Sequence, residues 1–82
     1  MRIRPTSKFA KQARKLTPNQ QRAVSRALKL LAANPRDPRQ RTHKLENTER
    51  WACGYSYDGR MVFRWDGDLI TLIAVGRHDE VY

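Results

Sequence analysis

The chain has 82 residues and a formal net charge of +9, from 17 Lys and Arg against 8 Asp and Glu. A chain of this length forms one domain with a thin core, which excludes a second catalytic domain and a large buried cofactor. We therefore expect a single domain over residues 1–82 with a shallow surface site.

The charge is divided unevenly between the two halves of the chain. Residues 1–45 hold 13 basic residues and one acid, a net charge of +12, whereas residues 46–82 hold four basic residues and seven acids, a net charge of −3. A field of this kind attracts a polyanion and speeds its encounter. Nucleic acid, the ribosome and an acidic protein are the partners that the charge favours.

Metal, disulfide and membrane sites are not expected. Cys53 is the only cysteine, so no internal disulfide can form, and no Cys/His cluster predicts a zinc site. Residues 1–5 lack an apolar signal core, and the most apolar stretch, residues 69–75, is far too short to span a bilayer. We expect a cytoplasmic protein with no cofactor and no membrane partner.

Two short elements are predicted at the start of the chain. Residues 2–5 fit an edge strand, where a proline is tolerated. Ser7 then resembles a helix cap, and apolar residues recur at helical spacing over residues 7–16, namely Phe9, Ala13 and Leu16.

A second helix has a clear start and a clear end. Thr17 fits the cap, Pro18 the first helical position, and Gln20 can complete a capping box. Asn34-Pro35 ends the helix. One apolar stripe faces the core: Val24, Ala27, Leu28 and Leu31.

Residues 35–50 are polar, hold two prolines and show no hydrophobic period, which predicts a loop. This loop carries five of the basic or titratable side chains: Arg36, Arg39, Arg41, His43 and Lys44.

Residues 50–76 predict a three-stranded meander with tight turns at Asp58-Gly59 and Asp66-Gly67. Two-residue turns there would put Tyr57 opposite Arg60 and Trp65 opposite Asp68, and directly opposite residues share a face.

This register predicts two unlike faces. The apolar face, expected to pack on the helices, holds Ala52, Gly54, Ser56, Met61, Phe63, Trp65, Ile70, Leu72 and Ala74. The other face mixes arginines and aromatics and holds Trp51, Cys53, Tyr55, Tyr57, Arg60, Val62, Arg64, Leu69, Thr71, Ile73, Val75 and Arg77. Such a face suits an RNA backbone with stacked bases, and it equally fits an ordinary half-covered face with snorkelling arginines. The fold class is α+β, with a short N-terminal strand and two antiparallel helices on one face of a three- to four-stranded antiparallel sheet.

The chain ends Gly76-Arg77-His78-Asp79-Glu80-Val81-Tyr82. A histidine next to an arginine at a strand end can transfer protons near neutral pH, although a lone surface histidine is usually inert.

The whole chain resembles the RelE/ParE superfamily of bacterial toxins, and within it the RelE/YafQ-like mRNA interferases. That branch ends in a glycine, any residue, a histidine, two residues, an aliphatic and an aromatic residue, as residues 76–82 do. It also places a histidine before a leucine and an aromatic strand, as at His43, and an aspartate at the hairpin, as at Asp58. Arg60 and Tyr82 fall where RelE has a functional arginine and a tyrosine.

The resemblance implies the toxin of a type II toxin–antitoxin system, a ribosome-dependent mRNA endonuclease that needs no metal. In such enzymes the RNA 2′-hydroxyl attacks the neighbouring phosphate. His78 would be the general acid, His43 the base with Asp58 as orienter or alternative base, and Arg60 would stabilise the phosphate. Tyr82 would stack on a base or position the phosphate.

Further RNA contacts and partners are implied in the same way. Arg77 and Lys44 would assist at the phosphate, and Arg64 and Tyr55 would bind RNA on the mixed face. The expected partners are an acidic or amphipathic antitoxin in a hetero-oligomer, mRNA on the ribosome, and ribosomal RNA.

The sequence departs from the family at the first strand of the meander. RelE has two lysines where this chain has Trp51 and Cys53, and YafQ-type members have a histidine where it has Gly54. A lysine base is therefore absent. Three alternatives follow: a ParE-like, non-enzymatic gyrase poison; a degraded nuclease that still binds the ribosome or RNA; and a structural protein whose charge binds an acidic antitoxin.

Overall fold

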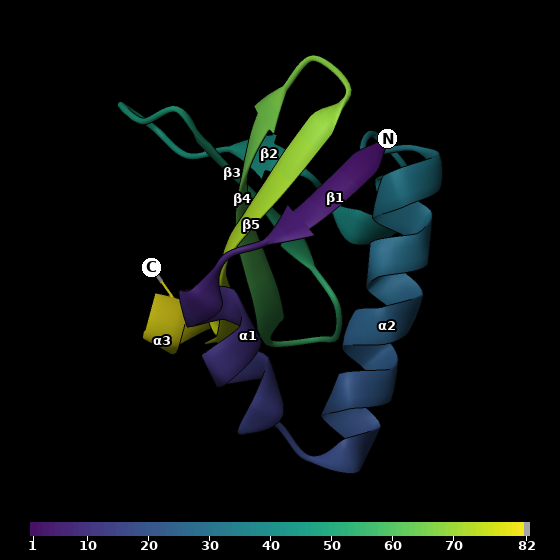
Figure 1. The fold of residues 1–82 in the computed structure, drawn as a ribbon, viewed down its shortest axis with the longest axis vertical. Coiled ribbons are helices and arrows are strands. Elements are labelled where there is room, and N and C mark those ends of the chain that lie inside the picture. The colour runs from purple at the N-terminus through teal and green to yellow at the C-terminus, as the bar shows by residue number, and fades with distance from the viewer. Residues whose placement is uncertain (82) are drawn as a thin grey trace.

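A five-stranded mixed sheet and two main helices make up the fold in the computed structural model, which describes residues 1–81 (Figure 1). The elements are β1 (Arg2–Pro5), α1 (Ser7–Arg14), α2 (Pro18–Ala33), the 3-10 helix η1 (Pro38–Gln40), β2 (His43–Lys44), β3 (Arg50–Gly54), β4 (Gly59–Asp66), β5 (Leu69–Arg77) and α3 (His78–Val81). The strand order is β1-β5-β4-β3-β2.

The α+β class and the meander are confirmed, but the sheet is larger and less uniform than predicted. β1 is an edge strand, as predicted, and it pairs parallel to β5, whereas all other pairs are antiparallel. The segment 35–50 is not only a loop, because it contains η1 and contributes β2 to the far edge of the sheet. No helix among residues 1–81 is long and apolar enough to cross a membrane.

Side-chain caps start both main helices. Thr6, not Ser7, caps α1: its backbone is extended and its hydroxyl accepts a hydrogen bond from the Phe9 amide at 3.2 Å. Thr17 caps α2 as predicted. Its hydroxyl accepts from the Gln20 amide at 3.2 Å, and the Gln20 side chain accepts from the Thr17 amide at 2.9 Å, which completes the capping box.

Replacing Thr17 with alanine is expected to lower the free energy of unfolding by about 1 kcal/mol, because one amide at the start of α2 loses its acceptor. Urea denaturation of the wild type, Thr17→Ala and Thr17→Ser measures the effect. The serine variant keeps the acceptor and should unfold close to the wild type. An alanine variant as stable as the wild type would show that the cap contributes nothing.

Both hairpins differ from the predicted register. In the first, Gly54 rather than Tyr57 lies opposite Arg60, because the chain forms a wider loop over residues 55–58. The Ser56 hydroxyl closes this loop by accepting a hydrogen bond from the Gly59 amide at 3.1 Å.

The second hairpin is shifted by one residue. Asp66 lies opposite Leu69 and the turn is Gly67-Asp68. Gly67 adopts a φ of +59°, which glycine tolerates, and the Asp68 carboxylate accepts a hydrogen bond from Arg2 at 3.2 Å.

The wider first loop inverts the predicted faces of β3. Cys53 lies opposite Met61 and Trp51 opposite Phe63, so both pack toward the helices, and Tyr55 follows them. A bulge between Val62 and Phe63 changes the later part of β5, so Val75 rather than Ala74 joins the core. The buried core is Phe9, Val24, Ala27, Leu31, Cys53, Met61, Phe63, Ile70, Leu72 and Val75.

We call the side of the sheet that faces away from the helices the open face. It consists of the residues that alternate with the core positions and pair with one another: Arg2, Arg4, His43, Arg50, Ala52, Gly54, Arg60, Val62, Arg64, Asp66, Leu69, Thr71, Ala74 and Gly76. Arg60 and Arg64 are therefore on the open face as predicted. Arg77 is not, because it alternates with the open-face residue Gly76, and the aromatics Trp51 and Tyr55 are not there either.

The segment between α2 and β2 is anchored to the helix side of the sheet. The Arg36 guanidinium lies 5.0 Å from the ring centroid of Trp51 and 5.3 Å from that of Trp65, and the two indoles meet edge to face at 5.2 Å. The buried Gln40 side chain donates to the Ala27 carbonyl at 2.6 Å. These contacts hold the segment that leads into β2.

Candidate active site

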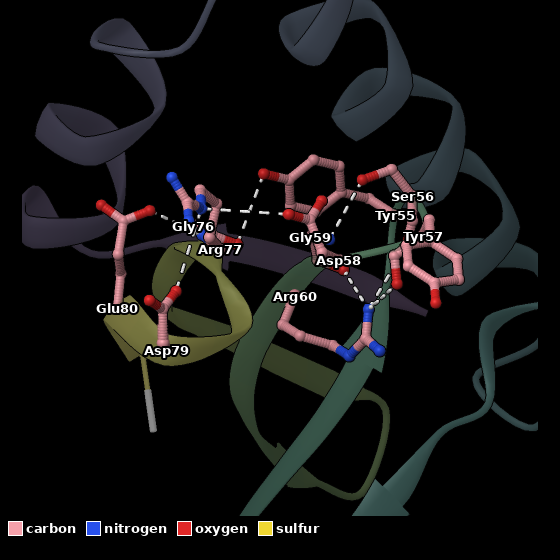
Figure 2. A network of polar contacts seen from close by, with 10 residues as sticks. All are labelled: Tyr55, Ser56, Tyr57, Asp58, Gly59, Arg60, Gly76, Arg77, Asp79 and Glu80. Atoms are coloured by element: carbon pink, nitrogen blue, oxygen red, sulfur yellow. Dashed lines mark hydrogen bonds and ion pairs between the residues drawn. The ribbon is translucent and has the colours of Figure 1, made fainter.

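Four of the predicted site residues come together where β4 begins and β5 ends. Arg77 lies opposite Gly59, and Arg60 lies opposite Gly76. The His78 amide donates a hydrogen bond to the Asp58 carbonyl at 2.8 Å, which ties the tail to the first hairpin loop. The main chains of Asp58, Arg60 and Arg77 therefore lie together beside the start of α3. The Arg77 side chain reaches Asp58, whereas the Arg60 side chain points to the other side of the sheet (Figure 2).

Gly76 lets α3 pack closely against the end of the sheet. A Cβ at Gly76 would lie 3.3 Å from Cγ1 of Val81 and 3.6 Å from Cβ of Glu80. The Glu80 carboxylate also accepts a hydrogen bond from the Arg77 amide at 3.0 Å. The glycine of the tail motif thus has a spatial role, since it places the helix that begins at His78 next to Arg60.

Arg60 is fixed by the loop that it follows. Its Nη1 donates to three main-chain carbonyls, those of Ser56 at 3.2 Å, Tyr57 at 3.1 Å and Gly59 at 2.8 Å (Figure 2). Within residues 1–81, Nε and Nη2 make no hydrogen bond and Arg60 makes no ion pair. Its neighbours in register are Gly54 and Gly76, so no side chain flanks it across the sheet. The free edge of the guanidinium can bind a phosphate through two parallel hydrogen bonds.

Arg77, in contrast, is matched by carboxylates. Its Nε lies 3.9 Å from Oδ2 of Asp58 and 3.8 Å from Oδ1 of Asp79. All three side chains are more than half exposed, so these ion pairs are loose and contribute little to stability. Within the described part of the chain, Arg60 is therefore the cation in this site that no carboxylate neutralises, so its charge is available to a ligand.

Tyr55 supports the loop from the helix side of the sheet. Its hydroxyl donates to the Gly76 carbonyl at 3.4 Å, and its ring lies against Gly59. Burial raises the pKa of the Tyr55 hydroxyl, and the nearby carboxylates of Asp58 and Glu80 raise this pKa further. The hydroxyl therefore stays protonated and acts as a donor within the site's framework.

Replacing Gly59 with alanine is expected to cost about 1–3 kcal/mol of folding free energy, because the added carbon would overpack the loop. A Cβ there would lie 2.4 Å from Cζ of Tyr55 and 2.5 Å from Oγ of Ser56. Thermal melting of the variant measures the loss.

Gly54→Ala is the matched control for this variant. A Cβ at Gly54 would meet only an ordinary contact, 3.4 Å from Nη1 of Arg60. The cost of Gly59→Ala should also fall in a Tyr55→Ala background. Equal melting temperatures for the two alanine variants would contradict the close packing of Tyr55 and Ser56 against Gly59.

The other predicted site residues lie elsewhere. His43 is on the open face opposite Ala52, with Nδ1 3.0 Å from the Arg41 carbonyl. β2 is three strands away from β5, roughly 14 Å across the sheet at the usual strand spacing. Lys44 lies opposite Trp51, on the helix side. Arg64 is on the open face but four residues from Arg60, and Tyr82 lies outside the described residues.

Two positions matched to lysines in RelE cannot replace them. Trp51 and Cys53 both face the helices. Burial raises the pKa of the Cys53 thiol to about 12, with Arg60 acting weakly in the opposite direction, so the thiol stays protonated and is no nucleophile.

Several residues of the site were not among the predicted ones. Glu80 binds the Arg77 amide three residues before it, which is the spacing of a capping box and could have been recognised. Gly59 and Ser56 shape the loop, but their contacts follow from a turn length that the Asp-Gly pair did not reveal.

No protein-family model matches the chain, and no curated protein sequence matches it. Solved structures do. YafQ from E. coli strain BL21(DE3) has a TM-score of 0.83 at 15% identity, over 100% of this chain and 99% of that one. A metal-bound toxin from Helicobacter pylori has a TM-score of 0.80 at 21% identity, with the same coverage. The E. coli RelBE toxin–antitoxin complex has a TM-score of 0.75 at 19% identity, over 93% of this chain and 94% of that one. The chain therefore has the RelE/YafQ-like toxin fold.

Proposed function

We propose that this chain, which has the RelE/YafQ-like fold, is the toxin of a toxin–antitoxin system and a ribosome-dependent, metal-independent mRNA endonuclease. The observation that carries the proposal is the meeting of Asp58, Arg60 and the tail that begins at His78 at one end of the sheet. These residues supply the proton-transfer groups and the cation that RNA transesterification requires.

The reaction is an internal displacement at phosphorus. The RNA 2′-oxygen loses its proton to a base and forms a bond to the adjacent phosphorus. The bond from phosphorus to the 5′-oxygen breaks, and an acid protonates this leaving oxygen. The products are a 2′,3′-cyclic phosphate and a 5′-hydroxyl, and the protein returns to its starting protonation state once the acid and base exchange protons with water.

We assign the acid to His78 and the base to Asp58. Asp58 is held beside His78 by the main-chain hydrogen bond, whereas His43 is roughly 14 Å across the sheet, and an acid or base must be within about 3 Å of the proton that it moves. His43 is then a contact for RNA further along the open face.

Arg60 stabilises the pentavalent phosphate through its free edge, and Arg77 positions Asp58 by its ion pair. Lys44 and Tyr55 face the helix side, so neither is assigned to the scissile phosphate. Stacking of Tyr82 on a base stays a proposal from the resemblance alone.

An antitoxin is the proposed protein partner, in a hetero-oligomer. The E. coli RelBE and DinJ–YafQ structures are toxin–antitoxin complexes, and the net charge of +9 favours an acidic or amphipathic antitoxin here. The net charge of +12 in residues 1–45 suits ribosomal RNA, which would deliver the protein to mRNA on the ribosome.

A cell-free translation reaction tests the proposal. Purified protein should stop synthesis of a reporter and leave its mRNA cut, while gyrase supercoiling in a parallel assay stays unchanged. Loss of supercoiling with intact mRNA would favour the ParE-like alternative. Loss of translation with intact mRNA would favour a degraded nuclease that still binds the ribosome.

A further inference from the structure

Three arginines form a straight row across the open face, at the end of the sheet away from the candidate active site. Arg50 on β3 lies opposite Arg64 on β4, Arg64 lies opposite Thr71 on β5, and Thr71 lies opposite Arg4 on β1. The row therefore crosses four neighbouring strands in register, and we call Arg4, Arg50, Arg64 and Thr71 the arginine row.

The positive charge of the arginine row is poorly balanced within the chain. Like charges directly opposite each other on neighbouring strands destabilise a sheet, and Arg50 and Arg64 are such a pair. Arg64 has only a loose ion pair, 4.0 Å from Nε to Oδ2 of Asp66, and over residues 1–81 Arg4 and Arg50 make none. A row of this kind is expected where an external anion supplies the missing charge.

We propose that the arginine row binds the phosphodiester backbone of single-stranded RNA, a few nucleotides from the phosphate that is cut at Arg60. The inference rests on the proposed function and adds the path of the substrate. Arg60 and Arg64 are on the same face of one strand, four residues or roughly 13 Å apart. Between them, Val62 and its cross-strand neighbours Ala52 and Ala74 have short side chains, and His43 lies at the far end of the same level of the sheet, opposite Ala52. A backbone can therefore run along β4 from one arginine to the other.

Burial on the open face favours RNA over an acidic peptide as the occupant. A bound peptide draws most of its affinity from apolar anchors in pockets. Between Arg60 and the arginine row, Ala52, Val62 and Ala74 are at most 4% exposed and offer no such anchor. A phosphate backbone needs only charge and hydrogen-bond donors, which guanidinium groups and the Thr71 hydroxyl supply.

Fluorescence anisotropy with a short labelled RNA, 2′-O-methylated throughout so that it cannot be cut, tests the row. The variants are Arg50→Gln/Arg64→Gln and, as matched control, Arg14→Gln/Arg22→Gln on the exposed helices, which removes the same charge. The row variant should bind about tenfold more weakly at low salt. The slope of log affinity against log salt should fall by about 1.4, at about 0.7 for each lost phosphate contact, against a smaller change in the control.

A second readout separates binding from folding. Removing the opposed charges should leave the melting temperature of the row variant unchanged or raised, so weaker binding cannot be ascribed to unfolding. Equal losses of RNA affinity in the row and control variants would overturn the proposal, because they would show that RNA responds to the overall positive charge of the protein. Unchanged RNA binding with weaker binding of a polyglutamate peptide would show that the row serves an acidic protein. Since the RNA is uncleavable, this experiment measures binding alone. Its result therefore tests the arginine row even if the protein proves not to be a nuclease.

Discussion

Replacing His78 with alanine is expected to lower the rate of RNA cleavage by about 10²- to 10⁴-fold, the usual range for loss of one positioned acid or base. Without the acid, the 5′-oxygen must leave as an alkoxide. Single-turnover cleavage of mRNA on ribosomes, at saturating protein, measures the chemical step apart from binding. The main-chain hydrogen bond from residue 78 to Asp58 does not need the imidazole, so the site should keep its shape.

His43→Ala is the matched control, since it removes the other histidine of the chain, which lies on β2. Its cleavage rate should change by less than about tenfold, because His43 lies three strands from β5, roughly 14 Å across the sheet, too far to move a proton at a phosphate beside His78. A loss in His43→Ala as large as in His78→Ala would contradict the assignment of the base to Asp58. A fully active His78→Ala protein would exclude His78 as the acid.

Replacing Arg60 with alanine is expected to lower cleavage by about 10²- to 10³-fold, as removal of one preorganised donor to a developing oxyanion does. Arg60→Lys should recover little of this loss. An ammonium group lacks the planar fork, so it cannot bind the Ser56 and Tyr57 carbonyls and also present two donors to a phosphate. Cleavage rates at saturating protein, together with melting temperatures, measure both effects.

Arg77→Ala provides the comparison for Arg60. The charge of Arg77 is already matched by Asp58 and Asp79, so its removal should cost much less than removal of Arg60. Equal losses would show that the site responds only to total positive charge. Full activity of Arg60→Lys would show that a point charge suffices and that the fixed guanidinium is not required.

Local signals in the sequence were sufficient for most of the fold. The capping box at Thr17 and the end of the helix at Asn34 are confirmed, because caps and turns depend on residues a few positions apart. The meander is also confirmed. The faces of its strands differ from the prediction, because Ser56 closes a loop wider than the two-residue turn that Asp58-Gly59 indicates and because the bulge at Val62 leaves no trace in the composition.

The candidate site was predictable in its residues more than in its geometry. The main chains of Asp58, Arg60 and Arg77 lie together beside the start of α3 because β4 and β5 are adjacent in both sequence and space. His43 belongs to a two-residue strand whose position depends on the Arg36 and Gln40 anchors, which are long-range contacts without a sequence pattern. The arginine row likewise follows only from the register of four strands.

The most direct test of the central claim is primer extension on an mRNA exposed to the purified protein, with and without ribosomes. The predicted result is a set of discrete cuts that the wild type produces only when ribosomes are present. These cuts should vanish in His78→Ala. An mRNA left intact by the wild-type protein on ribosomes would contradict the nuclease.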